Sequence, residues 1–565
     1  MASRNPSPAS LSTPLLSDSI SPTPTTNGHA GHHNHHDDDE ESPTVCGGDG
    51  GGGGDPFAFL SEDRPAWWSP RGVSPADPFR NGTPGWCGAY ELVRALVCAP
   101  VAAARLVLFG LSIAVGYAAT WVALRGWVDV RERAAQEGAG PMPAWRRRLM
   151  WITRISARCI LFSFGYHWIR RKGKPAPREL APIVVSNHVS YIEPIYFFYE
   201  LFPTIVSSDS HDSIPFVGTI IRAMQVIYVD RFSPASRKSA VNEIKVRMIP
   251  LDPTRKAACN SFPRVLLFPE GTTTNGRFLI SFQHGAFIPG YPVQPVIVRY
   301  PHVHFDQSWG NISLGKLMFK MFTQFHNFME VEYLPVVYPP EIKQENALHF
   351  AENTSYAMAH ALNVIPTSYS YGDSMIMARA VEDGKVNCSN YMVEMAWVKE
   401  TYGVSTSEAM ALLEDFLCMS PDKDGRVNAQ DFWAHFGLNC TPLCKKIFQY
   451  FDFEAKESIT FRQFLIGCAH LRKQPSFQDA CETAFERCRN PLTSHIGREQ
   501  LADVLRSSML ELMTDNGMMK LFKTLDVDDD DGISKDDLMA SLRKLPFMIA
   551  LFARRINGEV YIEIV

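Results

Sequence analysis

The sequence predicts an α/β domain that follows an N-terminal membrane helix or hairpin and precedes an all-α domain of repeated helix-loop-helix units. Three observations predict this arrangement: an uncharged apolar run over 106–124, strand-like runs alternating with helical segments over 180–340, and recurring helix-loop-helix candidates over 400–553. The chain has 565 residues, too many for one ordinary domain, and 45% of them are hydrophobic. We therefore expect several domains with buried cores.

Composition argues against some classes of function. The formal net charge is −5, so no overall basic character points to nucleic acid as a partner. Twelve cysteines lie scattered without a disulfide framework, which indicates reduced thiols facing the cytosol. The first 30 residues contain no basic segment followed by an apolar run, so we expect no secretory signal peptide. Residues 1–88 are rich in Ser, Pro, Gly and charged runs, which predicts a disordered tail.

Residues 89–172 are predicted to hold the chain at a membrane. The run Leu106–Leu124 carries no charge and is long enough to cross a bilayer. A second apolar stretch, Ala95–Ala104, precedes it, broken by Pro100 and separated from it by Arg105. One spanning helix and a short hairpin both fit this pattern, and a buried helix of a soluble domain is the alternative.

Basic clusters follow the apolar run. Arg146–Arg148 and Arg170–Lys172 favour the cytosolic side of the membrane and suit contact with anionic lipid headgroups. Between them, Leu149–Trp168 is apolar but carries Arg154 and Arg158. This composition predicts an amphipathic helix at the interface rather than a second span.

Residues 173–365 have the pattern of an α/β domain, in which β-rich runs alternate with helices. The predicted strands lie at 183–188, 226–231, 264–272, 293–300 and 329–337. Residues 366–398 are predicted to link this domain to the helical one.

A histidine and a carboxylate follow the first of these strands. His188 stands at the strand's end, and Glu193 comes five residues later. A neutral imidazole can take a proton from an alcohol at cytosolic pH, and a carboxylate can fix its tautomer and steady the imidazolium. The pattern predicts a general base with its orienting partner, while a purely structural pair is the alternative. Asn187 is expected to cap the helix that begins after it.

A Pro-Glu-Gly turn follows another apolar strand. It places the Glu270 carboxylate, the Gly271 backbone and the hydroxyls of Thr272 and Thr273 at the strand's carboxyl end, where open α/β sheets bind ligands. These groups suit hydrogen bonds to a glycerol backbone or a phosphate. Arg231, earlier in the chain, offers a planar fork for phosphate.

The segment 399–553 contains four helix-loop-helix candidates. Their loops begin near Ser420, Asp452, Arg489 and Asp526, and the spacings of 32, 37 and 37 residues are typical of paired EF-hands. Two of the four loops are expected to be empty because they lack most oxygen ligands. Residues 554–565 are predicted to form a tail.

The loop 526–537 is the best match to a Ca²⁺ site. Asp526, Asp528 and Asp530 occupy its first three ligand positions and Asp537 its last. Asp531 stands where such loops have glycine, and Asp537 is shorter than the usual bidentate glutamate, which weakens binding. We expect Ca²⁺ here, and the alternative is a purely structural helical domain.

Four ordered blocks resemble those of the glycerolipid acyltransferase family. Asn187–Glu193 resembles its NHxxxxD block, the stretch from Gly218 to Arg231 stands in the place of its GxxxxxR block, Phe268–Thr272 resembles its FPEGT block and Val293–Val296 its VxPV block. With its helix-loop-helix tail, the chain resembles the lysophosphatidylcholine acyltransferase group, and most closely the plant lysophosphatidylethanolamine acyltransferases, over about residues 90–550. The resemblance implies an α/β acyltransferase domain with an N-terminal membrane helix or hairpin, followed by an all-α EF-hand-like domain.

The resemblance also implies a mechanism without a cofactor, in which acyl-CoA is the co-substrate. His188 removes the proton from a lysophospholipid hydroxyl, which attacks the thioester, while Glu193 orients His188. Glu193 stands where the family pattern has aspartate; it keeps the charge with one more methylene, so we expect an active dyad. The strand at 293–298 is implied to line the acyl pocket. The residues implied to bind substrate are Asn187, Arg231, Glu270, Gly271, Thr272 and Thr273.

Several functional questions stay open at this point. The expected acceptor is lysophosphatidylethanolamine, with lysophosphatidylcholine or another lysophospholipid also open and lysophosphatidic acid as the alternative. A Ca²⁺-responsive membrane scaffold without activity is the rival class, because Glu193 departs from the pattern. The protein is expected at an endomembrane of the ER, Golgi or endosome, with both domains on the cytosolic side. Asn-x-Ser/Thr matches at Asn81, Asn311 and Asn353 are then expected to be unused.

Overall fold

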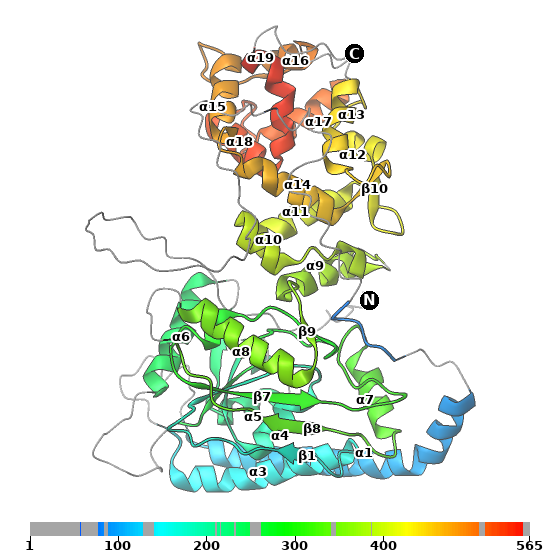
Figure 1. Ribbon diagram of the computed structural model, residues 1–565, viewed down its shortest axis with the longest axis vertical. Helices are drawn as coiled ribbons and strands as arrows, with labels where there is room; N and C mark the ends of the chain where they lie inside the picture. Colours follow the sequence, from blue (N-terminus) through cyan, green and yellow to red (C-terminus); the bar gives the residue numbers. More distant parts are fainter. Residues whose placement is uncertain are drawn as a thin grey trace, which may run out of the picture. The chain divides into compact units, whose positions relative to one another are not determined.

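The structure is a computed structural model. It describes Phe57 and residues 77–83, 89–127, 141–208, 212–214, 216–230, 233–248, 262–340, 346–385, 387–507 and 515–557. These residues fall into two compact units, the first over 77–375 with 394–396, and the second over 376–393 and from 397 onward (Figure 1). Most of the predicted tail over 1–88, and residues 558–565, lie outside the described residues.

A seven-stranded sheet in the order β1-β8-β7-β2-β5-β3-β4 forms the centre of the first unit. All neighbouring strands are parallel except β7 and β8, which are antiparallel. Each of the five predicted strands contains an observed strand, whereas β1 and β3 were not predicted, β1 because its three basic residues are exposed at the sheet edge. The bounds are β1 Arg170–Lys172, β2 Ile183–Ser186, β3 Thr204–Ser208, β4 Ile227–Val229, β5 Val265–Leu267, β7 Val293–Arg299 and β8 Glu330–Tyr333.

Helices cover both faces of this sheet. Strand β2 is buried throughout, as parallel strands with two covered faces are, and its side chains alternate between two cores. Ile183 and Val185 pack with α6 and α8, while Val184 packs with α4, α7 and the end of α3 (Figure 1). The helices are α3 Ala144–Ser163, α4 Ile192–Glu200, α5 Val217–Ala223, α6 Pro234–Met248, α7 Leu314–Phe322 and α8 Asn346–Leu362; shorter elements are η4 His284–Ala286 and the pair β6 Phe278–Leu279 with β9 Ile365–Pro366.

Helix α1, Ala89–Leu124, runs without interruption through Pro100. The hairpin prediction for this stretch is therefore wrong, because the chain does not turn back between the two apolar segments. Its residues 92–124 are long and apolar enough to cross a membrane by length and composition. Leu96, Val97 and Val107 are each more than half exposed, so much of the apolar surface of α1 has no protein cover.

Helix α3 packs antiparallel against α1. The hydroxyls of Thr120 and Thr153 lie 3.0 Å apart, and Arg146, near the start of α3, donates to the carbonyl of Ala123 at the end of α1. Gly116 allows close approach, because a Cβ there would lie 3.1 Å from Ser156 Cβ. The predicted interfacial segment over 149–168 is thus a helix as far as Ser163, paired with the apolar helix (Figure 1).

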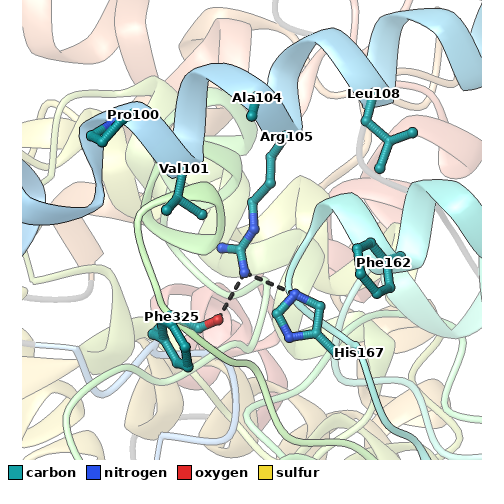
Figure 2. A pocket seen from close by; sticks show the side chains of 8 residues that line it. All are labelled: Pro100, Val101, Ala104, Arg105, Leu108, Phe162, His167 and Phe325. Carbon is teal, nitrogen blue, oxygen red and sulfur yellow. Dashed lines mark hydrogen bonds between the residues drawn. The ribbon is translucent and has the colours of Figure 1, made fainter.

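Arg105 interrupts the apolar surface of α1 for a structural reason. Its guanidinium is buried and donates to the carbonyls of Phe322 at 3.0 Å and Phe325 at 2.8 Å, and also to that of Gln324. These carbonyls lie in the last turn of α7 or just after it, where helices leave acceptors unsatisfied and favour positive charge. Figure 2 shows the guanidinium between Phe325 and His167, beside an open pocket of about 460 Å³ lined mainly by α1. Arg105 therefore fastens α1 to the end of α7.

The second unit is built of helices with two short antiparallel pairings. Strand β10, Arg426–Asn428, pairs with β11, Ser458–Thr460, and Ile496 bridges to Ile533. The helices are α9 Tyr371–Glu382 (whose first turn lies in the first unit), α10 Met395–Tyr402, α11 Thr406–Cys418, α12 Ala429–His435, α13 Pro442–Phe451, α14 Phe461–Lys473, α15 Phe477–Cys488, α16 Arg498–Ser507, α17 Asp515–Leu525, α18 Lys535–Lys544 and α19 Ala553–Asn557, with η5 Cys388–Tyr391 and η6 Pro546–Phe552.

Replacing Arg105 tests its role as the link between α1 and α7. Arg105→Leu suits the apolar helix but leaves the carbonyls after α7 without their donor, so we expect the first unit to lose about 1.5–3 kcal/mol of unfolding free energy. Denaturation of the purified protein in detergent, followed by tryptophan fluorescence, measures this. Arg148→Leu, at an exposed position on α3, is the matched control and should change stability by about 0.5 kcal/mol at most. Equal stability of the two variants would contradict the link.

Candidate active site

His188 and Glu193 meet where β2 ends and α4 begins. The Nδ1 atom of His188 lies 3.1 Å from Oε2 of Glu193, whose side chain is fully buried. The same carboxylate accepts the backbone N–H of Ser190 at 2.9 Å and that of Val189 at 3.3 Å. These two N–H groups belong to the loop just before α4, and Glu193, in the first turn of that helix, reaches back to them. The helix dipole also favours a negative charge at this end of α4. Glu193 is thus fixed before any substrate arrives.

The imidazole of His188 is oriented on its other sides as well. It stacks on Phe268, with ring centroids 4.2 Å apart and planes inclined by 21°, and its side chain is 13% exposed. The carboxylate at Nδ1 assigns the proton to that nitrogen, which leaves the Nε2 lone pair free. Within the part of the chain that the structure describes, Nε2 has no hydrogen-bond partner. The ring therefore presents a basic nitrogen to an incoming group.

The turn after β5 holds the backbone of His188 from both sides. The His188 N–H donates to Glu270 Oε1 at 2.8 Å, and its carbonyl accepts the N–H of Thr274 at 2.8 Å. Gly271 adopts φ +76°, a left-handed conformation that favours glycine, and its N–H closes the turn onto the carbonyl of Phe268. The two sequence blocks that predicted the site thus lie directly against each other.

The side chains implied to bind substrate make protein contacts here. Glu270 is fully buried, and Thr272 and Thr273 are 5% and 6% exposed. The Thr273 hydroxyl donates to the carbonyl of Trp309 at 2.7 Å. Contact between these residues and substrate stays a prediction; in the structure Glu270 holds the backbone of His188, and Thr273 holds the loop that contains Trp309.

Asn187 does not cap α4. Its side-chain amide donates to the carbonyl of Val298 at 2.9 Å and accepts the N–H of that residue at 2.8 Å, while Tyr191 stands at the helix N-cap. The capping prediction is wrong because β7 offers both a donor and an acceptor just where β2 ends. Asn187 is 2% exposed and prolongs the pairing of β2 with β7 beside His188. Its contact with substrate stays a prediction.

Comparison with known proteins identifies the family of the chain. The family model described as Acyltransferase matches residues 169–299, from the start of β1 to the end of β7. The chain is 56% identical to the lysophospholipid acyltransferase LPEAT2 of Arabidopsis thaliana over 499 residues, which is 88% of this chain and 89% of the relative. The chain belongs to the lysophospholipid acyltransferase family.

Other matches are more distant. The lysophosphatidylcholine acyltransferase of Drosophila melanogaster is 31% identical over 72% of this chain and 75% of that protein. Among solved structures, the 1-acyl-sn-glycerophosphate (LPA) acyltransferase PlsC of Thermotoga maritima matches with a TM-score of 0.30 and 17% identity, over 46% of this chain and 96% of that one. Recognition of the family from the four sequence blocks is confirmed, and the protein is an acyltransferase.

Some residues of this acyltransferase site were not predicted, and one predicted residue is not seen. Arg231 lies outside the described residues. Phe268 and Thr274 flank the Pro-Glu-Gly turn, so they lie beside His188 because that turn does. Trp309, whose N–H donates to the carbonyl of Val189 at 2.8 Å, comes from a distant loop without a local signal.

Glu270 is a buried carboxyl with an altered proton affinity. Burial raises its pKa from 4.5 to about 8, although hydrogen bonds from the His188 N–H and the Thr274 hydroxyl oppose the rise. At neutral pH the group therefore holds a proton in the folded enzyme. A neutral carboxyl here can accept the His188 N–H without adding a second full negative charge beside Glu193.

The raised pKa predicts how stability depends on pH. Between pH 4.5 and about 8 the unfolded chain releases the Glu270 proton while the folded enzyme keeps it, so stability falls as pH rises through this interval. Glu270→Gln keeps an acceptor for the His188 N–H and cannot ionise. The melting temperature of Glu270→Gln, relative to that of the wild type, should increase as pH rises across the interval. Glu179→Gln, at an exposed position, is the control, and its melting temperature should change with pH as that of the wild type does. Parallel profiles for all three proteins would refute the assignment.

Proposed function

We propose that this acyltransferase transfers an acyl chain from acyl-CoA to the free hydroxyl of a lysophospholipid, with lysophosphatidylethanolamine as the first candidate acceptor. Lysophosphatidylcholine is the second candidate, supported by the names of the more distant relatives. The observation that carries the proposal is the His188–Glu193 pair, 3.1 Å apart, with Nε2 free at the carboxyl edge of the sheet. Lysophosphatidic acid, the alternative acceptor, would use the same chemistry.

The geometry supports direct transfer by general-base catalysis. His188 Nε2 takes the proton of the acceptor hydroxyl while that oxygen bonds to the thioester carbonyl carbon. Glu193 stabilises the resulting imidazolium through Nδ1. The carbon–sulfur bond then breaks, and the imidazolium returns its proton to the departing thiolate of coenzyme A. Positioned bases of this kind supply about 10²–10⁴-fold in rate.

An oxyanion develops on the thioester carbonyl during the transfer. Backbone donors near Gly271–Thr273 are the proposed stabilising groups. The Gly271 N–H and the Thr273 hydroxyl are already engaged with protein carbonyls. The backbone N–H groups of Thr272 and Thr273 are therefore the better candidates.

The intact dyad favours an enzyme over an inactive scaffold. Glu193 is longer than the aspartate of the family pattern, and its longer side chain spans the distance from the first turn of α4 to Nδ1 while still accepting the Ser190 N–H. Glutamate in place of aspartate at position 193 therefore keeps the contact with His188 on which base catalysis depends.

The exposed apolar surface of α1 and α3 supports attachment to a membrane. Trp121, Trp145 and Trp151 are each about half exposed, and arginines lie over Trp145 and Trp151 at 4.5 and 4.0 Å. Tryptophan and arginine together suit the boundary between lipid tails and water. We propose that the protein works at an endomembrane of the ER, Golgi or endosome, with the sheet and the second unit on the cytosolic side.

Features of the second unit support EF-hand folds and one Ca²⁺ site. The eighth residues of paired loops are joined, Val427 to Ile459 and Ile496 to Ile533, as in EF-hand pairs. Ligand oxygens of Asp526, Asp528 and Asp530 lie within 4.8 Å of one another. Oδ1 of Asp526 is buried and lacks a partner among the described residues, so a hard, oxygen-preferring cation fits.

The last ligand position is less favourable. Asp537 accepts the Ser534 N–H in a capping box and is shorter than glutamate. Asp531, at the usual glycine position, adopts φ +70°. Both departures predict weaker affinity than a standard loop has.

An acyl-transfer assay tests the proposed function. Membranes containing the full chain, supplied with labelled acyl-CoA and a panel of lysophospholipids, should form diacyl product in preference to free fatty acid. His188→Ala should lower the rate by about 10²–10⁴-fold because the base is lost. His349→Ala, at an exposed position on α8, is the control and should keep the wild-type rate. An unaffected His188→Ala protein would support the scaffold instead.

Calcium titration tests the Asp526 loop. Asp526→Asn keeps the size of the side chain but removes the buried charge, so we expect Ca²⁺ binding at least about 10-fold weaker. Calorimetry on the detergent-solubilised full chain measures it. Asp503→Asn, an exposed carboxylate on α16, should bind as the wild type does. Absence of binding in the wild-type chain would leave the second unit purely structural.

A further inference from the structure

A short segment before α1 lies across the loops of the active site. We name residues Asp77–Thr83 the N-terminal strap. Phe79 and Asn81 in this segment are buried, 6% and 9% exposed, although the sequence predicts disorder up to residue 88. Five residues, 84–88, separate the end of the strap from the first residue of α1.

One set of strap contacts reaches the loop that follows β7. The side-chain amide of Asn81 donates to the carbonyls of Asp306 at 3.1 Å and Ser308 at 2.6 Å, and to the Ser308 hydroxyl at 3.2 Å. The Asn81 N–H donates to Asn311 Oδ1 at 3.1 Å. Thr83 exchanges hydrogen bonds with the backbone of Asp306, donating from its hydroxyl at 3.2 Å and accepting the N–H at 3.0 Å.

A second set of contacts reaches the turn that holds His188. The Asn275 N–H donates to the carbonyl of Pro78 at 2.7 Å, and its side-chain amide donates to the carbonyls of Asp77 at 2.8 Å and Arg80 at 3.2 Å. Asn275 follows Thr274, whose N–H binds the His188 carbonyl. The strap thus binds Asn275, the residue next to the one that binds the backbone of the catalytic base.

The strap makes these contacts at very close range. A Cβ on Gly310 would lie 2.3 Å from the carbonyl oxygen of Phe79, and a Cβ on Gly82 would lie 2.3 Å from Arg277. At Gly310 the neighbouring atoms belong to the strap backbone, so glycine there lets the strap approach the loop after β7, whereas at Gly82 the neighbour is the end of the Arg277 side chain. This close packing indicates a specific contact between the strap and the loop.

The two loops under the strap also hold each other and the base. Thr273 donates to the carbonyl of Trp309, and Trp309 donates to that of Val189, next to His188. We propose that the strap is a positioning element for catalysis: by fastening residues 274–277 to residues 306–311, with Asn81 at its centre, it fixes the wall at which the lysophospholipid acceptor binds. This inference rests on the proposed function for the identity of the acceptor.

The proposal also explains an Asn-x-Thr match. Asn81-Gly82-Thr83 has the glycosylation pattern, yet the Asn81 amide nitrogen donates hydrogen bonds to three oxygen atoms of the protein. Asn353, in a second such match, is exposed on α8. The pattern at Asn81 is accounted for by the fold of the strap.

Kinetics of Asn81→Ala in the full chain tests the strap. Loosening the wall should lower kcat/KM for the lysophospholipid at least about 10-fold, because small displacements of positioned groups cost this much. The KM for acyl-CoA should change less than about twofold. Thr83→Val, which removes only one hydroxyl, should shift the same parameter in the same direction and guards against a variant that fails to fold.

Asn327→Ala is the matched control for lost stability. Asn327 is also buried, and its amide donates to two backbone carbonyls, those of Phe164 and Met321, away from the strap. If Asn81→Ala keeps the acceptor kcat/KM of the wild type, or if Asn327→Ala loses as much of it, the strap has no positioning role. Asn353→Ala should behave as the wild type does.

Hydrogen exchange separates failure of the strap from failure of the proposed function. In Asn81→Ala, and not in Asn327→Ala, the amides of Thr274 and Asn275 should exchange at least about 10-fold faster, since both lie in the network that the strap closes. Unchanged exchange overturns the strap even if the enzyme is active. Faster exchange in a protein whose wild type acylates no lysophospholipid keeps the strap as a positioning element and overturns the acceptor assignment alone.

Discussion

The backbone of His188 is held on both sides by a single turn, and the rest of the site depends on this constraint. Its N–H and its carbonyl are both engaged by residues 270–274, so the imidazole begins from a fixed point. The ring then needs only two further restraints, the Glu193 carboxylate at Nδ1 and the face of Phe268. Because β2 and β5 are neighbouring parallel strands, their carboxyl ends bring base and turn together without a long loop.

The same constraint places two carboxyl groups near one imidazole, which would be unfavourable if both were ionised. The structure separates their tasks by environment. Glu193 accepts the backbone N–H of Ser190 just before α4, whereas Glu270 lies in a fully buried turn that raises its pKa to about 8. In the proposed mechanism Glu193 balances the charge on the imidazolium, while Glu270 accepts a backbone N–H in its neutral form.

Much of this fold could be predicted from local patterns, and the exceptions have physical causes. Strands β2, β5 and β7 are nearly continuous apolar runs bounded by polar motifs, so their existence and the meeting of His188 with the Glu270 turn followed from sequence. Strand β1 is three exposed basic residues and carries no strand signal. Asn187, whose amide satisfies both backbone groups of Val298, depends on which strand lies next to β2, and sequence spacing does not encode that choice.

The apolar helix is part of the catalytic unit rather than a detached anchor. Arg105 ties its middle to the end of α7, and Ala102 and Phe109 pack against the core cluster that contains Val189 and Ile192. A charged residue within an apolar surface would be costly in lipid, but here three backbone carbonyls take up its donors. Helix α1 is therefore packed into the same core as the residues that flank His188. A displacement of α1 would be transmitted to that core, since close-packed interiors carry strain rather than absorb it.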